Sequence, residues 1–248
     1  METIEPILTV SDLDATFPDK NGGLHALRQV TFSVMPNRFI CILGPSGSGK
    51  STLLRILAGV LRPSGGSVHF SGASPRFGFV FQQSNLMPWR RVLDNVTLPL
   101  EVEGWSRPDA RQRAEDLLQL VGLQGFQHSW PRDLSGGMAQ RVAIARALAH
   151  DPDFLLLDEP FGSLDALTRE RMGGELLRIW QISRKTVLMV THSISEALFL
   201  SDEVLVLTQR PGSIKQHLVV PLPRPRTDEM RYTPLFGELA SKLKEAME

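Results

Sequence analysis

The order of apolar and polar residues in the first part of the chain predicts strands. Residues 7–43 form apolar runs interrupted at Pro18, at an expected turn over Asn21–Gly23 and at Pro36–Asn37, which predicts several short strands. The last run, Phe39–Leu43, is apolar throughout and indicates a strand buried on both faces. The chain is therefore expected to begin with a β-rich region.

A helix is predicted directly after the buried strand, from Lys50 to about Ala58, with Gly59 ending it. Residues 65–82 return to strand-like patterns, with Gly65–Gly66 expected as a turn and the apolar run Phe77–Phe81 as a strand. The β-rich first part thus contains one helix.

The pattern becomes helical from about Val92 to Ala149. One helix is predicted over Arg107–Val121, with Pro108 near its start and Gly122 at its end, and a second over Gly136–Ala149. Strand-like runs with helices between them follow at Phe154–Leu157, Thr186–Val190 and Glu203–Leu207. Strands that alternate with helices imply an α/β core of parallel βαβ units, with the sheet covered on both faces.

A single domain is expected over residues 1–248. Its α/β core comprises about 1–91 and 150–220, and an inserted helical subdomain comprises about 92–149. A short tail over 221–248 is expected to be extended after Pro221 and helical from about Pro234 to Met247.

Composition narrows the classes of function. The 248 residues are 42% hydrophobic and 22% charged, which is ordinary for a globular protein, and 27 basic residues balance 27 acidic ones. Because the chain lacks the positive field that usually accompanies DNA or RNA binding, no nucleic acid is expected as a partner.

Cysteine content and hydropathy point to the cytoplasm. The single cysteine, Cys41, lies in an apolar run and is expected to be a buried core residue, so no disulfide framework is expected. The start METIEPILTV lacks the features of a signal peptide, and no apolar run approaches the roughly 18 residues that span a bilayer. The chain is expected in the cytoplasm, unless a partner holds it at a membrane.

The segment Gly44–Thr52 reads GPSGSGKST and fits the phosphate-loop motif G-x-x-x-x-G-K-[ST] between a predicted strand and a predicted helix. Glycines let backbone N–H groups approach phosphate oxygens without interference from a Cβ, and the helix start adds its positive end. Lys50 is expected to bind the β- and γ-phosphates, Ser51 to offer its hydroxyl to Mg²⁺, and Thr52 to contact the α-phosphate. The remaining nucleotide-binding residues expected here are Gly44, Pro45, Ser46, Gly47, Ser48 and Gly49.

Two carboxylates, Asp158 and Glu159, directly follow the predicted strand Phe154–Leu157. Such a pair taken alone is equally typical of a solvated turn, but ligands of parallel sheets collect at the carboxyl ends of strands. Beside a phosphate loop, Asp158 is expected to hold Mg²⁺ through its water shell, and Glu159 to accept a proton from the attacking water.

The segment Leu134–Arg141 reads LSGGMAQR and opens the second predicted helix. Ser135 is a natural N-cap, and Gly136 and Gly137 leave helix-terminal N–H groups uncovered, so the segment is a candidate anion site. A second phosphate cradle is hard to place on the same nucleotide within one copy of the chain.

These motifs together resemble the ATP-binding cassette subunits of ABC transporters, and the resemblance covers nearly all of residues 4–220. It implies a P-loop NTPase ABC ATPase fold with an N-terminal antiparallel β-subdomain and an inserted α-helical subdomain. It also implies that ATP and Mg²⁺ bind in a homodimer, in which the LSGG segment of one copy caps the γ-phosphate held by the other.

The resemblance assigns roles to residues outside these motifs. Phe17 lies where an aromatic side chain stacks on adenine, with a core aromatic as the alternative. Gln82 matches a glutamine that senses Mg²⁺ and the lytic water. The loop Ser163–Asp165 resembles one that contacts the opposite subunit, which places Asp165 among the nucleotide-binding residues, and His192 resembles a switch histidine near the γ-phosphate.

Finer similarity points to importers of the nitrate, sulfonate and taurine type, a group that also takes up pyrimidine precursors. The segments that carry it are Leu86–Trp89, Phe161–Arg169, Lys185–Leu200 and Arg210–Ile214. Trp89 is interpreted either as part of a permease-docking groove or as a buried packing residue. Such importers use transmembrane permease subunits and a separate substrate-binding protein, which implies a peripheral position on the cytoplasmic face of the inner membrane.

The expected reaction is in-line attack of water on the γ-phosphate, with Glu159 as base, Lys50 and His192 holding the transferred group, and Gln82 reporting its state. An ABC exporter or lipid-extraction subunit would share this chemistry and differ in its partner. A non-transport ABC ATPase acting on nucleic acid or ribosomes is the other alternative. Such proteins tend to have two cassettes or long coiled-coil insertions, and this sequence predicts neither.

Overall fold

The computed structural model describes residues 5–18, 23–72 and 74–248. The chain divides into two compact units, a first unit of residues 1–75 and 186–248 and a second unit of residues 76–185. The segment expected as a helical subdomain, 92–149, lies inside the second unit. Most of the turn predicted at Asn21–Gly23, and the start of METIEPILTV, lie outside the described residues.

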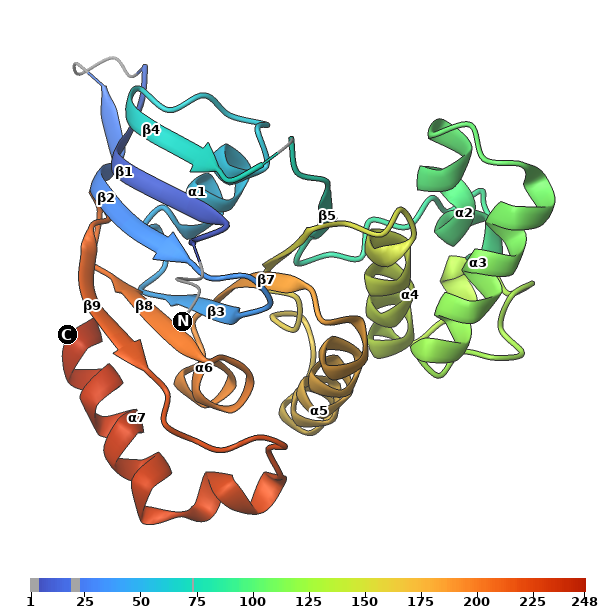
Figure 1. Ribbon diagram of the computed structural model, residues 1–248. Coiled ribbons are helices and arrows are strands. Elements are labelled where there is room, and N and C mark those ends of the chain that lie inside the picture. The colour runs from blue at the N-terminus through green and yellow to red at the C-terminus, as the bar shows by residue number, and fades with distance from the viewer. Residues whose placement is uncertain (1–4, 19–22, 73) are drawn as a thin grey trace. The chain divides into compact units, whose positions relative to one another are not determined.

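The first unit contains two sheets and three α-helices within its described part (Figure 1). Its strands are β1 (Leu8–Phe17), β2 (Leu24–Val34), β3 (Phe39–Leu43), β4 (Gly65–Phe70), β7 (Thr186–Thr191), β8 (Glu203–Leu207) and β9 (Ile214–Val219). Its helices are α1 (Lys50–Leu57), α6 (Ile194–Leu200) and α7 (Pro234–Met247), with a 3₁₀ turn at Asp228–Tyr232.

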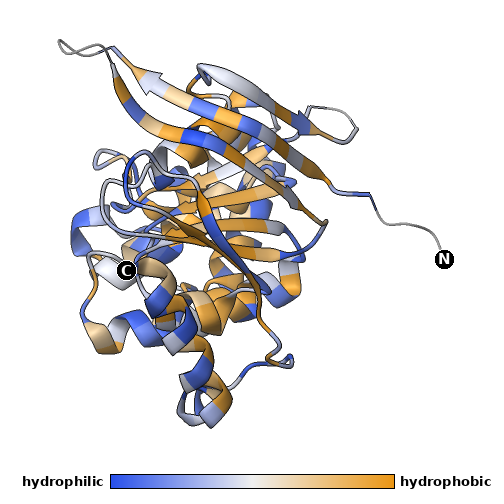
Figure 2. Ribbon diagram, turned by 90° about the vertical axis from the view of Figure 1, so that its left-hand side faces the viewer, coloured by the Kyte–Doolittle hydropathy of each residue, from blue (hydrophilic) through white to orange (hydrophobic). Residues whose placement is uncertain are grey.

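The N-terminal sheet is antiparallel, with the order β2-β1-β4, as the sequence resemblance implied. Its strands alternate hydrophobic and hydrophilic residues along their length (Figure 2), because one face covers a core and the other does not. Strand β1 ends before Pro18 as predicted, but β1 and β2 have 10 and 11 residues and are not the short strands expected.

The turn predicted at Gly65–Gly66 is wrong, since both glycines belong to β4. The register between β1 and β4 shifts between Ser11 and Asp14, opposite these glycines. A Cβ on Gly66, whose φ is 75°, would overlap the backbone carbonyls of Ser11 and Asp12. Glycine at this position therefore allows the two strands to approach closely. A glycine pair occurs both at such approaches and in turns, so the sequence alone did not distinguish them.

The second sheet of the first unit is built on β3, which pairs in parallel with β7 on one side and β8 on the other. All five residues of Phe39–Leu43 are buried, which confirms the predicted buried strand, and Cys41 among them has no exposed surface. Strand β9 joins β8 in antiparallel orientation and was not predicted. It lies at the sheet edge and carries polar residues such as Lys215 and Gln216, so its sequence lacks an apolar run.

The C-terminal tail is partly regular. Helix α7 begins and ends at the predicted residues, Pro234 and Met247, and it packs against α6 and β8. The stretch from Pro221 to Thr227 contains no helix or strand, as expected, but it is followed by the unpredicted 3₁₀ turn.

The second unit combines a pair of parallel strands with four α-helices in its residues 76–185. Its elements are β5 (Phe77–Val80), α2 (Val92–Val102), α3 (Arg107–Leu120), α4 (Gly136–Leu148), β6 (Phe154–Asp158) and α5 (Ala166–Ser183), with a 3₁₀ turn at Pro131–Asp133. Helices α3 and α4 begin at the predicted residues, and each ends one residue before the predicted end. Among all described residues, no helix combines the length and apolar character needed to cross a membrane.

Candidate functional site

The phosphate-loop motif occupies the connection between β3 and α1. Gly47 and Gly49 have φ values of 78° and 92°, in the left-handed region that favours glycine. A Cβ on Gly49 would lie 2.7 Å from both the Ala26 carbonyl oxygen and Leu27 Cδ2, so a larger residue would push the loop off β2. Gly47 faces open space, with no atom within 4 Å of where its Cβ would be.

Lys50 opens α1 and is 5% exposed. Its Nζ donates hydrogen bonds of 2.9 Å to the carbonyl oxygens of Gly44 and Pro45, so the ammonium is held against the first two residues of the loop. Ser48 Oγ is buried and has no hydrogen-bond partner among the described residues. A cation, uncovered backbone at glycines and an orphaned hydroxyl together fit an anion such as a nucleotide phosphate.

The loop after β8 packs against the phosphate loop through Gly212. Gly212 donates its N–H to the Ala26 carbonyl oxygen and accepts from the Arg28 N–H, both at 2.9 Å. A Cβ on Gly212 would overlap the carbonyl oxygen of Ser48. The loop is thus held to β2 and pressed against the phosphate loop, and the sequence alone did not single out this glycine for that contact.

His192 lies at the same sheet edge as the phosphate loop. Strands β3 and β7 are parallel, and Leu43 pairs with Thr191, so the residues that follow them, Gly44 and His192, leave neighbouring strands side by side. His192 is exposed, and Ser193 after it caps α6 by accepting the Glu196 N–H at 3.3 Å. The histidine is therefore not a core packing residue.

Phe17 is the last residue of β1 and is half-buried. It is absent from the fully buried core, which disfavours the interpretation as a core aromatic. Part of Phe17 is therefore accessible, which stacking on a ligand requires.

In the second unit, the two predicted carboxylates lie at the end of β6. Asp158 closes the strand and is 7% exposed, and Glu159 follows with a φ of 46°. The left-handed region costs a residue with a Cβ about 1–2 kcal/mol, and such strain gathers at functional sites.

Gln82 lies close to this carboxylate segment. Strands β5 and β6 are parallel with Val80 paired to Leu157, so the two chains leave the same sheet edge. A Cβ on Gly162 would lie 3.0 Å from Gln82 Nε2, and the Gly162 N–H donates to the Glu159 carbonyl oxygen at 3.0 Å. The structure therefore brings Gln82 and the Glu159 turn together, as a shared role requires.

Helix α4 holds the segment around Gln82 at two points. The Gln140 amide donates to the Phe81 carbonyl oxygen at 3.1 Å, and Arg146 donates to the carbonyl oxygens of Ser84 and Asn85, both at 2.9 Å. Gln140 is 3% exposed, and burial lowers the pKa of Arg146. Sequence reasoning did not assign these two residues, because their partners lie about 60 positions away.

The LSGG segment begins α4 as predicted. Ser135 is the N-cap, and its Oγ accepts the Met138 N–H at 3.3 Å, while Ser135 and Gly136 are exposed. A Cβ on Gly136 would lie 3.2 Å from Leu164 Cδ2, and one on Gly137 would lie 3.3 Å from Thr168 Cγ2. The helix start thus packs against the first turn of α5 and against the loop Ser163–Asp165, which the sequence assigned to contact a second copy.

Asp165 in that loop caps α5. Its Oδ1 accepts the Thr168 N–H at 3.0 Å, and this backbone hydrogen bond lowers the pKa of the exposed carboxyl. Asp165 is therefore ionised and fixed in place near neutral pH.

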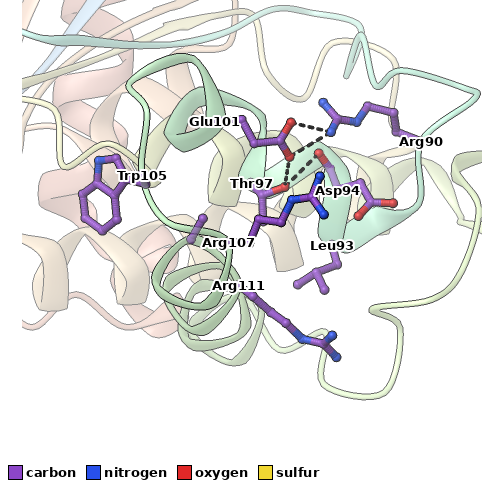
Figure 3. A pocket seen from close by; sticks show the side chains of 9 residues that line it. Arg90, Leu93, Asp94, Thr97, Glu101, Trp105, Arg107 and Arg111 are labelled. Atoms are coloured by element: carbon purple, nitrogen blue, oxygen red, sulfur yellow. Dashed lines mark hydrogen bonds and ion pairs between the residues drawn. The ribbon is translucent and has the colours of Figure 1, made fainter.

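Two cavities lie in the second unit. One of 640 Å³ lies between α2 and α3 (Figure 3), where Arg90 pairs with Glu101 at 2.7 Å and Arg111 pairs with Glu115 at 2.9 Å. Despite its size, this cavity is a poor candidate for the nucleotide site. Its Arg90 and Arg111 guanidinium groups already have carboxylate partners, and no glycine-rich loop lines it. The other is a mainly apolar groove of 560 Å³ beside the Gln82 segment.

Trp89 lies in the loop before α2 and is 72% exposed, so its interpretation as a buried packing residue is wrong. Within the segments predicted to carry function, the structure thus forms two groups. The phosphate loop, Phe17 and His192 belong to the first unit, and Gln82, Asp158, Glu159, Asp165 and the LSGG segment belong to the second. The described residues contain no cluster of three or more His, Cys, Asp or Glu side chains suited to a metal.

Comparison with known proteins identifies the family. The family model described as ABC transporter matches residues 27–162. The nitrate import ATP-binding protein NrtD of Synechocystis sp. is 41% identical over 95% of this chain and 93% of its own length. The taurine import ATP-binding protein TauB of Yersinia pestis bv. Antiqua is 46% identical over 86% of this chain and 84% of its own.

A solved structure agrees with these relatives. The ATP-binding cassette MJ0796, in a dimeric post-hydrolysis state bound to ADP and Pi, aligns with a TM-score of 0.76 and 32% identity over 87% of this chain and all of its own. The chain belongs to the ABC transporter family and is an ATP-binding, ATP-hydrolysing subunit with the ABC ATPase fold.

Proposed function

We propose that this chain is the ATPase subunit of an ABC importer, that it works as a head-to-tail homodimer, and that it drives uptake of a small nitrate-, sulfonate- or taurine-like solute or a pyrimidine precursor. The observation that carries the proposal is the phosphate loop at the end of β3, next to His192 in a chain whose relatives NrtD and TauB are import proteins. The charge balance argues against a nucleic-acid partner.

The chemistry needs four contributions. Lys50 and the loop from Gly44 to Thr52 bind the phosphates, and His192 contacts the γ-phosphate from the neighbouring strand. Glu159, turned out of the line of β6, accepts the proton of the attacking water, and Gln82 beside it detects the state of that water. Phe17 stacks on the adenine.

Mg²⁺ would be held by the Ser51 hydroxyl, with Asp158 and Gln82 acting on its water shell. Bound there, it would neutralise charge that develops on the phosphates. A site of this type draws most of its ligands from phosphate and water, so it does not need a dedicated cluster of protein carboxylates.

The exposure of the LSGG segment supports the proposed head-to-tail dimer. Ser135 and Gly136 carry the N-terminal end of α4 to the surface, where N–H groups and the helix dipole favour an anion. Asp165 is exposed beside them. We infer that these groups meet the γ-phosphate bound to the second copy, and the dimeric state of MJ0796 with ADP and Pi supports that arrangement.

The apolar groove of the second unit is proposed as the docking site of a permease. It is lined mainly by Phe79, Phe81, Met87, Leu98, Val102 and Ala147. Phe81 and Val102 are 38% and 81% exposed, which is unusual for large apolar side chains in one depression. A short amphipathic helix from a membrane subunit would bury them, and would hold this subunit at the cytoplasmic face of the membrane.

Contacts around the groove suggest how docking is coupled to hydrolysis. The groove residue Phe81 precedes Gln82, and its carbonyl is bound by Gln140 on the helix that begins with LSGG. A change in the state of the nucleotide would therefore shift the equilibrium between open and closed dimers and move the groove with α4.

Transport is tested by reconstituting the subunit with the permease and substrate-binding protein encoded beside it. Uptake of radiolabelled nitrate, taurine, alkanesulfonate and pyrimidine precursor into vesicles should depend on ATP and disappear with Glu159→Gln. If no candidate partner binds and ATP hydrolysis runs at full rate without a permease, an importer role is excluded.

Docking is tested by charge substitution. Val102→Asp should abolish co-purification with the permease in detergent, because it places a carboxylate in the apolar groove. Ile182→Asp on α5 is the matched control, since Ile182 is 61% exposed and does not line the groove. Equal recovery of permease with both variants would exclude the groove as the docking site.

A further inference from the structure

The C-terminal segment between β9 and α7 makes specific contacts that the proposed mechanism does not use. It carries Arg224, Arg226 and Arg231, and it passes below α6 in Figure 1. Helix α6 has seven residues, which is too short for a helix to be stable by itself. It begins two residues after His192, so whatever fixes α6 also fixes the backbone that carries this histidine.

Two arginines bind the C-terminal end of α6. Arg226 Nη1 donates to the carbonyl oxygens of Leu198 at 2.7 Å and Phe199 at 3.0 Å, and Arg224 Nη2 donates to that of Leu200 at 2.8 Å. The last carbonyls of a helix lack intrahelical partners and carry its negative end, so two cations stabilise them in both respects.

Arg226 remains a cation at neutral pH despite its position. It is 7% exposed, and burial together with the nearby Arg224 lowers its pKa to about 10. Arg224 is also bound to Asp202, whose other oxygen accepts the Phe39 N–H at 2.9 Å. The tail is therefore anchored to β3, the strand that leads into the phosphate loop.

A third arginine contacts α6 near both of its ends. Arg231 Nη1 donates to Ser195 Oγ at 2.7 Å, and its guanidinium lies 3.7 Å from the centre of the Phe199 ring. Its side chain is 10% exposed, so both contacts are shielded from water. Ser195 is three residues after His192 and two after the N-cap Ser193, in the first turn of α6.

We propose that Arg224, Arg226 and Arg231 form a clamp that fixes α6 and thereby positions His192 for its contact with the γ-phosphate. They are positioning residues, because each acts through the helix and not on the nucleotide. The inference rests on the role proposed above for His192, and it gives the tail a part in turnover.

The test is a double-mutant cycle in the full-length chain. Arg231→Leu keeps an apolar contact with Phe199 but loses the hydrogen bond to Ser195. It should lower kcat for ATP about tenfold, because His192 is then misplaced relative to the γ-phosphate. The KM for ATP should stay within about twofold, since the phosphate loop is unchanged. In a His192→Ala background, the same substitution should lower kcat no further.

Controls separate positioning from stability. Asp228→Asn alters a residue that pairs with Arg231 at 3.3 Å but has no hydrogen bond or ion pair with the described residues of α6, and it should leave kcat unchanged. Arg231→Lys retains the charge and one donor, so it should recover part of the lost rate. All assays are run well below the melting temperature of each variant. Arg226→Leu should behave as Arg231→Leu does, provided that it folds.

The outcomes distinguish the two proposals. If His192→Ala itself has wild-type kcat, the proposed role of His192 is wrong. If His192→Ala is slow but Arg231→Leu has wild-type kcat, or if Arg231→Leu costs the same factor with and without His192, the clamp alone is overturned.

Discussion

Replacing Gly212 by alanine tests how closely the loop after β8 supports the phosphate loop. The added Cβ would overlap the carbonyl oxygen of Ser48 and lie 3.4 Å from Leu27 Cδ2. The loop is not free to move away from Ser48, because the N–H and the carbonyl of Gly212 each form a 2.9 Å hydrogen bond with β2. Gly212 has no positive φ, so the effect is steric and not conformational.

The magnitude follows from the two ways to relieve the overlap. Separating the loop from β2 loses two hydrogen bonds, each worth about 1 kcal/mol, and shifting packed backbone costs about 1–3 kcal/mol. Both routes lower the free energy of unfolding by about 1–3 kcal/mol. In a chain of this length, each kcal/mol lowers Tm by about 2–4 °C. If half of this strain, about 0.5–1.5 kcal/mol, falls on Ser48, the Kd for ATP rises about two- to tenfold.

The assay is paired thermal melting and fluorescent-nucleotide titration of the full chain. The matched control is Gly237→Ala in α7, where a new Cβ meets no atom within 4 Å and alanine favours the helix. Wild-type nucleotide affinity and an unchanged Tm in Gly212→Ala would refute the proposed support of the phosphate loop.

Three further predictions concern single groups. Glu159→Gln should bind ATP with nearly unchanged affinity and lose turnover by about a hundredfold or more, measured by phosphate release, because the base is removed; near-wild-type turnover would contradict the assignment. Cys41 should resist thiol reagents in the native state and react after unfolding, because burial raises the pKa of its thiol, and rapid native labelling at neutral pH would contradict this. For Glu101, burial raises the pKa, but hydrogen bonds from Arg90 and Thr97 outweigh it and lower the pKa below its ordinary 4.5 (Figure 3). Stability from this group is thus present above pH 4.5 and lost as pH falls through the lower folded value, so the small difference in unfolding free energy between wild type and Glu101→Gln should shrink in acid; a difference that grows would show that the sign is wrong.

The parts of the fold that the sequence predicted depend on local patterns. The strand Phe39–Leu43 and the helix α7 are marked by unbroken apolar residues or by helical spacing with a proline at the start. Strand β9 was missed because an edge strand can be polar, and Gly65–Gly66 was misread because a glycine pair marks close strand approach as well as turns.

The candidate site shows the same division. The phosphate loop, the carboxylates and LSGG were located by short motifs, since their chemistry needs residues adjacent in sequence. Gln140, Gly212 and Arg226 were not assigned, because their roles arise from contacts with Phe81, Ser48 and Leu198, which folding brings together from 28 to 164 positions away, as the residue numbers show. No sequence pattern marks such contacts.

The central claim is that each ATP is completed by two copies of the chain, and mixing two inactive variants tests it most directly. Lys50→Ala disables the phosphate loop, and Ser135→Arg blocks the LSGG surface that would face the other copy. In a mixed dimer both defects fall on one site and leave the other intact, so an equal mixture, combined before ATP is added, should recover about a quarter of wild-type ATPase activity. If the mixture hydrolyses ATP no faster than the two variants do separately, the nucleotide is not shared between copies.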